Sequence, residues 1–255
     1  MTLPPEILDK ILEQIPESRE RGRTLTACAL VATWWTEPSQ RHIFSSVEIT
    51  ERNYRQWADG VVLSRSKDHL LGHIRSLWHN RGAILGNWYQ MQNLAQDAGG
   101  YLSGLRNLQD LTLSCIDISV EHISEGELHT CFSAFRETLT YLNLKSFATS
   151  FSTFMTLVGY FPNITILRLR SLILKPDEGP VPSLSRPLRG TFRVFEIQAD
   201  SLEFLVRFAQ LDMEYEELII DSFSELKATG FAETALRISP STVKFLKLMA
   251  DLECK

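Results

Sequence analysis

The 255-residue chain lacks a basic excess, a long apolar run and a dense set of cysteines. Its 26 Lys and Arg are outnumbered by 31 Asp and Glu, so the formal charge is −5, whereas general nucleic-acid binders are usually basic. No apolar run approaches the roughly 18 residues that a membrane-spanning helix needs. The first residues, which include Glu6 and Asp9, also lack the basic segment and apolar core of a signal peptide. We therefore expect an intracellular protein, cytoplasmic and/or nuclear, that binds neither membranes nor nucleic acids.

The cysteines and histidines form no recognisable metal site. The four cysteines are scattered, as free thiols in a reducing compartment are: Cys28, Cys115, Cys131 and Cys254. Four potential zinc ligands fall within seventeen positions, but their spacing fits no common zinc framework: Cys115, His122, His129 and Cys131. The chain also lacks Gly-x-Ser-x-Gly, a phosphate-binding Gly-rich loop, His-Glu-x-x-His and Cys-x-x-Cys. We expect no metal, no cofactor and no catalytic activity.

The composition that remains is that of an ordinary globular protein. Hydrophobic residues make up 44% of the chain and charged residues 22%, which is too apolar for a disordered chain. The length suits either one large domain or a small domain followed by a larger one.

An apolar-rich stretch over residues 3–44 predicts three short helices. Pro4 and Pro5 suit the first turn of the first helix, where a missing N–H costs nothing, and Pro16 ends that helix. Five apolar residues at helical spacing form one stripe along it: Ile7, Leu8, Ile11, Leu12 and Ile15.

The second and third helices have boundary signals of their own. Thr24 is the expected N-cap of the second helix. The third helix is expected to start near Thr33 and to be broken or restarted at Pro38. Three helices in about forty residues form too small a core to be stable alone. Their apolar side chains therefore predict that a partner, or the rest of the chain, covers them.

This stretch resembles an F-box, in particular those of the large fungal F-box families. The pattern is Leu-Pro, an apolar pair, Ile at helical spacing, Leu-Val followed by Trp, and a closing basic-His-aliphatic-Phe. The matching residues are Leu3, Pro4, Ile7, Leu8, Ile11, Ile15, Leu30, Val31, Trp35, Arg41, His42 and Phe44. Ala32 and Thr33 depart from the family, which often has Ser and a basic residue there, and the spacer 17–23 is long and charged. The alternative is an unrelated three-helix cap.

A second pattern repeats after the F-box-like stretch. It consists of an apolar residue, two spacers, an apolar residue, one spacer and an apolar residue. Its middle positions are Val47, Leu77, Leu111, Leu142, Leu167, Phe195, Leu218 and Leu246. The intervals run from 23 residues (Phe195 to Leu218) to 34 (Leu77 to Leu111), and the shorter ones fit a leucine-rich repeat. The copy at Leu77 is degenerate, because His79 takes the third apolar place.

Helical patterns separate these strand-like segments. They cover residues 54–63, 88–102, 128–135, 151–161, 201–211 and 226–236. Alternating strands and helices predict parallel strands joined by crossovers. The four prolines between Lys175 and Thr191 predict an exposed loop there.

The repeats resemble the irregular leucine-rich repeats that follow F-boxes. The asparagine usual after such strands is absent, and Cys115 and Ser146 stand in that neighbourhood. The expected fold is therefore α/β: a small three-helix F-box in residues 1–46, then an irregular leucine-rich-repeat-like solenoid in residues 47–255 with a parallel sheet on its concave face. The alternative is a doubly wound α/β domain. Because only Met249 to Lys255 follow the last strand pattern, we expect the chain to end without a full cap.

Alternation along the strands predicts which side chains face outward from the sheet. Lys145, Arg168 and Arg170 are expected to converge as a basic centre, beside an acidic group formed by Glu196, Glu217 and Asp221. Our hypothesis is that an acidic or phosphorylated substrate segment binds at Tyr141, Lys145, Arg168 and Arg170. The alternative is a solvated face on which the opposite charges pair with one another.

The F-box resemblance implies a substrate-recognition subunit of a Skp–cullin–F-box ubiquitin ligase. Such a subunit is not an enzyme; it bridges a Skp-family adaptor, and through it a cullin–RING ligase, to a protein substrate. The residues that the resemblance assigns to the adaptor are Leu3, Pro4, Ile7, Leu8, Ile11, Ile15, Leu30, Val31 and Trp35. One alternative is a non-ligase scaffold that uses the adaptor only for stability, and another is a metabolic enzyme.

Overall fold

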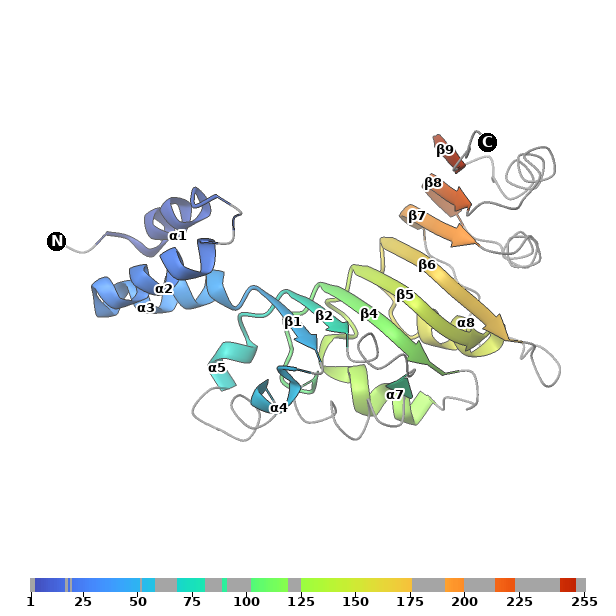
Figure 1. Cartoon of the computed structure of the whole chain (residues 1–255), viewed down its shortest axis with the longest axis horizontal. Helices are drawn as coiled ribbons and strands as arrows, with labels where there is room; N and C mark the ends of the chain where they lie inside the picture. Colours follow the sequence, from blue (N-terminus) through green and yellow to red (C-terminus); the bar gives the residue numbers. More distant parts are fainter. Residues whose placement is uncertain are drawn as a thin grey trace.

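The computed structural model describes residues 3–16, 18, 20–50, 52–57, 68–80, 89–90, 102–118, 125–175, 191–199, 214–222 and 244–250 (Figure 1). Within these residues, three helices precede a sheet of nine strands, so the fold class is α/β, as predicted. The helices are α1 (Pro5–Glu13), α2 (Arg21–Val31), α3 (Thr33–Ile43), α4 (Tyr54–Trp57), α5 (Asp68–Leu71), α7 (Glu125–Phe132), the 3-10 helix η4 (Ser133–Phe135) and α8 (Phe151–Gly159). The strands are β1 (Ser46–Thr50), β2 (Ser76–Asn80), β3 (Tyr89–Gln90), β4 (Asp110–Asp117), β5 (Tyr141–Ser150), β6 (Ile166–Lys175), β7 (Thr191–Ala199), β8 (Glu214–Ser222) and β9 (Phe245–Ala250).

The N-terminal helices form a small unit with its own interior. Pro4 is the N-cap of α1 and Pro5 its first residue, as predicted. The interior is formed by Leu8 and Leu12 of α1 and Leu25 of α2, all fully buried. Asp9 links α1 to α3, because its carboxylate lies 3.2 Å from an Arg41 guanidinium nitrogen and 3.5 Å from His42 Nε2. Among the described residues, none from α1–α3 belongs to the large buried cluster of the sheet.

Two predicted boundaries in this unit are wrong. Helix α2 begins at Arg21, with Glu20 as its N-cap, so Thr24 lies inside the helix. The Thr24 hydroxyl donates to the Glu20 carbonyl at 3.0 Å, which is the back-bonding of a mid-helix threonine and not a cap. Helix α3 runs through Pro38 without a break. Pro38 is buried there, and this tertiary packing outweighs the lost backbone hydrogen bond.

The strands form one parallel sheet in which strand order follows chain order. The order is β1-β2-β4-β5-β6-β7-β8-β9, and the short strand β3 pairs with the far end of β4. The repeat sets the register, because its eight middle positions are direct partners across the sheet: Val47, Leu77, Leu111, Leu142, Leu167, Phe195, Leu218 and Leu246. The first seven of these side chains are buried.

Helices cover one face of the central strands. In Figure 1, α7 and α8 lie along the lower side of β4–β6. Their buried side chains belong to the same cluster as the strand residues: Leu128, Cys131 and Phe132 of α7, Phe135 of η4, and Phe154, Leu157 and Val158 of α8. No described element covers the opposite face, which lies between the N-terminal helices and the rising strands β7–β9 (Figure 1).

The predicted crossover helices are only partly confirmed. The helices expected at 128–135 and 151–161 are present as α7 with η4 and as α8, and α4 forms the start of the one expected at 54–63. The helix expected at 88–102 is wrong at its start, because Tyr89 and Gln90 pair with Ile116 and Asp117 of β4 as strand β3. The helices expected at 201–211 and 226–236, the proline-rich loop and the C-terminal cap lie outside the described residues.

Three neighbouring strands adopt a left-handed backbone conformation at one aligned position. Cys115, Ser146 and Ser171 have φ values of 58°, 48° and 51°. The residues just before and just after these three positions are paired across β4, β5 and β6, whereas the three residues themselves are not. Each of the three is thus one extra residue inserted in its strand. In β5, for example, the core positions move from Leu144 to Phe147, a step of three where a regular strand has two. The kink column, as we call these three residues, lets each strand bury a second apolar row.

None of the helices within the described ranges has the length and apolar character that crossing a membrane requires.

The kink column generates a prediction for Ser146. A Val at φ 48° places a β-branched side chain in the left-handed region, so Ser146→Val should lower the free energy of unfolding by about 1–2 kcal/mol. Ser146→Gly should be neutral or stabilising by up to about 1 kcal/mol, because glycine adopts this conformation without strain. Urea denaturation measures both values. Equal free energies for the two variants would contradict a left-handed backbone here.

Candidate functional site

The uncovered face of the sheet carries a row of polar and aromatic side chains. One row crosses the sheet from β2 to β7, with each residue paired to the next on the adjacent strand: Trp78, Thr112, Asn143, Arg168 and Glu196. The next row along the strands contains Ser114, Lys145 and Arg170. Side chains of both rows point away from the buried cluster because the residues between them fill it. These two rows form the candidate site.

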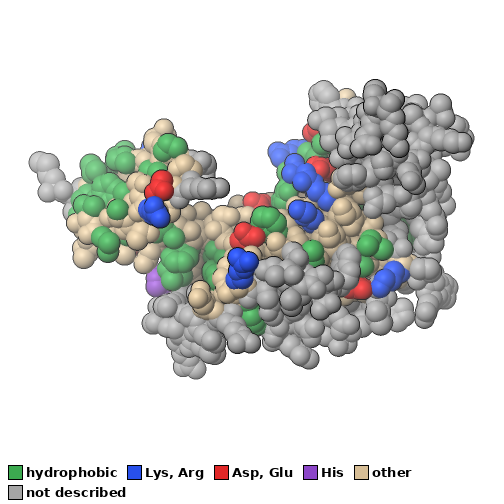
Figure 2. Space-filling view, viewed as in Figure 1, with side chains coloured by type: hydrophobic (Ala, Val, Ile, Leu, Met, Phe, Trp, Pro, Cys, Tyr) green, Lys and Arg blue, Asp and Glu red, His purple; other side chains and the backbone are tan. Residues whose placement is uncertain are grey.

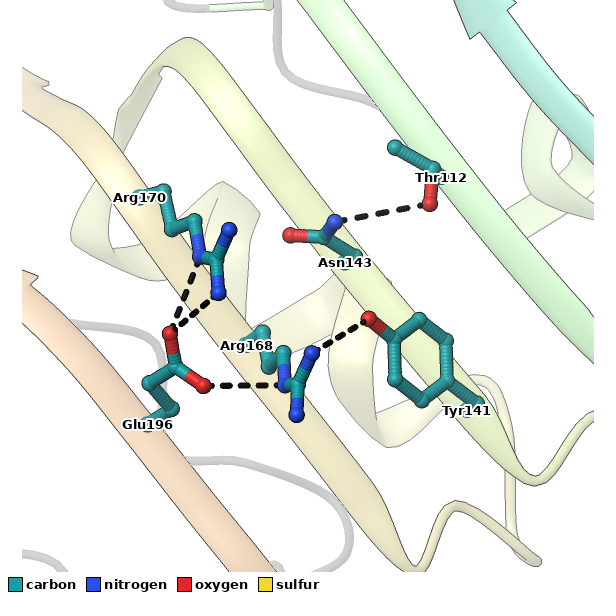
Figure 3. Close-up of polar contacts among 6 residues, drawn as sticks. All are labelled: Thr112, Tyr141, Asn143, Arg168, Arg170 and Glu196. Carbon is teal, nitrogen blue, oxygen red and sulfur yellow. Dashed lines mark hydrogen bonds and ion pairs between the residues drawn. The ribbon is translucent and has the colours of Figure 1, made fainter. Parts of the chain in front are cut away.

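One carboxylate organises the basic part of the site (Figure 3). Glu196 Oε1 accepts hydrogen bonds from Arg170 Nη2 at 2.7 Å and Arg170 Nε at 2.9 Å, and Oε2 lies 2.9 Å from Arg168 Nε. The Glu196 side chain is only 11% exposed, whereas those of Arg168 and Arg170 are 35% and 42% exposed. Charge-assisted contacts of this kind are strong, and they fix the orientation of both guanidinium groups.

Tyr141 completes this arrangement on the other side of Arg168. Arg168 Nη1 donates to the Tyr141 hydroxyl at 3.3 Å, and its guanidinium carbon lies 5.5 Å from the ring centroid (Figure 3). Asn143, in the same row, donates from Nδ2 to Thr112 Oγ1 at 3.4 Å. The site thus contains two sets of contacts: Thr112 with Asn143 on β4 and β5, and Tyr141 with Arg168, Glu196 and Arg170 on β5, β6 and β7.

Lys145 points away from the arginines. Its ammonium lies 5.9 Å from the centroid of the Trp78 ring on β2, across the intervening strand β4. The Trp78 indole N–H donates to Ser114 Oγ at 2.9 Å, so the ring is held in place, and Trp78 is 38% exposed. A cation above a tryptophan face is attracted by the ring electrons.

The predicted basic centre is therefore only partly correct. Arg168, Arg170 and Tyr141 come together, but Lys145 diverges from them because Trp78 attracts its ammonium group. Glu196 was expected in a separate acidic group, yet it lies between the two arginines. The site predicted from the sequence did not include Trp78. Its position between the two core positions of β2 indicates that it faces outward, and this could have identified it.

The residues assigned to an adaptor divide into exposed and buried ones. Leu3, Ile7 and Ile11 are each 43% exposed, and Leu30 and Val31 are 82% and 71% exposed. Pro4 is also exposed, and Ile15 and Trp35 are half-buried. Leu8, expected in the exposed patch, is buried instead, because helix α1 turns it toward the interior that it shares with Leu12. Figure 2 shows hydrophobic side chains spread over this N-terminal unit.

The considered zinc ligands do not assemble in the described part of the chain. There, no group of three or more His, Cys, Asp and Glu side chains is placed to hold a metal ion. Burial, together with the nearby Glu127 carboxylate, raises the pKa of Cys131 to about 11, which disfavours the thiolate that a metal binds. His129 Nδ1 lies 3.2 Å from the Tyr160 hydroxyl. His122 lies outside the described residues.

No protein-family model matches the chain, and no curated protein matches it significantly.

The clamp between Glu196 and the two arginines predicts a stability effect. Glu196→Gln leaves two guanidinium groups without their carboxylate and should lower the free energy of unfolding by about 1–3 kcal/mol. Glu216→Gln is the matched control, because the Glu216 side chain is 44% exposed and forms an ion pair with the exposed Lys244. An exposed pair is worth at most about 1 kcal/mol. Urea denaturation measures the free energy of unfolding of both variants. A smaller decrease for Glu196→Gln than for Glu216→Gln would contradict a stabilising contact between Glu196 and the two arginines.

The thiols offer a second test. Cys131 is buried and its pKa is raised to about 11, so iodoacetamide should label it only when the chain unfolds or when the pH approaches that value. Half-buried Cys28 should be labelled before Cys131 in the native chain at mildly alkaline pH. Peptide mass spectrometry over a time course measures both rates. Similar native-state rates for the two thiols would contradict the burial of Cys131.

Proposed function

We propose that this chain is the substrate-recognition subunit of a Skp–cullin–F-box ubiquitin ligase. Helices α1–α3 form the F-box and bind a Skp-family adaptor, and the sheet presents a protein substrate. The chain itself makes and breaks no bond. Its contribution is proximity, since holding a substrate lysine near the charged ubiquitin carrier raises the effective concentration of the two reactants.

The observation that carries this proposal is the exposure of large apolar side chains on α1–α3. Leu3, Ile7 and Ile11 lie about one helical turn apart and are equally exposed, while Leu8 and Leu12 fill the interior. Leu30 and Val31, at the end of α2, are more exposed still. Exposed apolar groups on a soluble unit mark an interaction surface. All five exposed residues belong to the F-box pattern of the sequence.

The sheet topology supports a leucine-rich-repeat-like solenoid in residues 47–255. Each repeat adds one parallel strand beside the preceding one, which is how solenoids grow. A doubly wound domain would reverse its strand order at a switch point, and the described strands show no such reversal along the path from β1 to β9. The kink column also falls at or beside the positions where the family usually has asparagine, a residue that tolerates positive φ.

Truncating the exposed apolar surface tests the adaptor assignment. The double variant Ile7→Ala with Ile11→Ala should weaken capture of a purified Skp adaptor by about 1–4 kcal/mol, as for a central interface anchor. Leu3→Ala with Pro4→Ala should act in the same direction. Ile173→Ala is the matched control, because Ile173 is 44% exposed but lies on β6 of the sheet. Surface plasmon resonance with immobilised adaptor measures the affinities.

The controls separate binding from folding and ligase from scaffold. Circular dichroism must show that the double variant keeps its helices; undiminished capture by such a folded variant would refute the assigned face. Addition of the cullin then decides between the two roles. Recovery of adaptor and cullin together on the chain supports a ligase subunit, whereas recovery of adaptor without cullin indicates a scaffold that uses the adaptor for stability.

A further inference from the structure

The candidate site carries more positive charge than its own carboxylate neutralises. Lys145, Arg168 and Arg170 contribute three positive charges and Glu196 one negative charge, although the whole chain has a formal charge of −5. Lys145 has no ion pair with any carboxylate in the described part of the chain. Figure 2 shows basic side chains on the inner wall of a hollow, where Figure 1 places β5–β7. The site therefore attracts anions.

The arginines keep hydrogen-bonding capacity for a ligand. A guanidinium has five N–H donors. Arg168 uses one donor on the Tyr141 hydroxyl, and its Nε lies 2.9 Å from Glu196 Oε2 as an ion pair without hydrogen-bond geometry. Arg170 uses two donors on Glu196 Oε1. Both arginine side chains are more than a third exposed, while the Glu196 side chain is largely buried. Glu196 thus orients the two groups and leaves their outer edges for a second acceptor.

The geometry separates the cationic groups into two points. The Lys145 ammonium lies over Trp78 toward β2, whereas both arginines reach toward Glu196 on β7. Neighbouring strands are about 4.8 Å apart, so the two points are separated by roughly 10–14 Å, the length of about four residues of extended chain. A single phosphate group cannot contact both points. Two carboxylates on one extended segment can.

A cation of the chain itself lies over one face of each aromatic ring of the site, which reduces the ring surface left for stacking by nucleic-acid bases. Trp78 has the Lys145 ammonium over its ring, and Tyr141 has the Arg168 guanidinium over its ring. Single-stranded nucleic acids bind through bases stacked on free aromatic faces, together with a basic groove. The acidic residues Asp110 and Glu217 also flank the site in the adjoining register row. This arrangement favours a short acidic peptide confined to the two basic rows.

We propose that the sheet face between Trp78 and Glu196 binds an extended, acidic protein segment that crosses the strands. One Asp or Glu carboxylate of the segment contacts Lys145, and a second, about four residues away, contacts the outer edges of Arg168 and Arg170. The identification of this segment as part of a ubiquitination substrate rests on the proposed function. The binding itself does not, since it follows from the charges and geometry of the site.

The test uses the full chain and a fluorescein-labelled Gly/Ser peptide with two glutamates about four positions apart. Fluorescence anisotropy should show binding that weakens as salt is added. Replacement of both glutamates by Gln should reduce the affinity about tenfold or more, and Lys145→Gln in the protein should reduce it about two- to fivefold. Lys244→Gln is the matched control: it removes one exposed positive charge outside the site and should leave the affinity unchanged.

Several outcomes would overturn the proposal. Equal binding of the Gln peptide, or an equal effect of Lys244→Gln, would mean that no defined acidic site exists. Tighter binding of a peptide with one phosphoserine in place of the two glutamates would indicate a single phosphate site instead. Tighter binding of oligouridine would indicate a nucleic-acid surface. Adaptor capture measured on the same protein separates the two proposals: absent peptide binding with intact capture refutes only this one, and lost capture refutes only the proposed function.

Discussion

The structure depends on the parallel register of its strands. Each strand has a narrow apolar face that it can bury only if the neighbouring strands present theirs at the same level. The middle residues of the repeats are direct partners from β1 to β9, although their intervals in the sequence differ. A slip of one residue in any strand would turn its core residues outward. The segments between the strands therefore absorb the differences in length, and the register is kept.

The same register creates the candidate site. Arg170 and Glu196 are 26 residues apart in the chain, yet they meet because their strands are adjacent and aligned. The kink column has a related role: one extra residue in each of β4, β5 and β6 lets Ile116, Phe147 and Leu172 join the buried cluster. The outward rows and the buried rows are thus consequences of one alignment, and a variant that disturbs either should affect both.

Local sequence signals predicted helix boundaries correctly where tertiary packing did not compete with them. The double proline at Pro4 and Pro5 correctly predicted the start of α1, because both residues suit the first helical turn. Signals that compete with tertiary packing were misleading. Pro38 did not interrupt α3, since its burial supports the helix, and Tyr89 joined the sheet because β4 offered an unpaired stretch for it.

From sequence alone, the repeat pattern was sufficient to predict the fold class, the positions of all the described strands except β3, and the face on which Tyr141, Lys145, Arg168 and Arg170 lie. Only the tertiary structure decided where the ends of these side chains go. Glu196 brings two arginines together, and Trp78 draws Lys145 away from them. Likewise, helical spacing placed Leu8 and Ile11 in one stripe, but packing against the other helices buried only Leu8. The physical reason is that periodicity determines the face on which a side chain starts, whereas the position of a long side chain's charged end depends on partners from other strands.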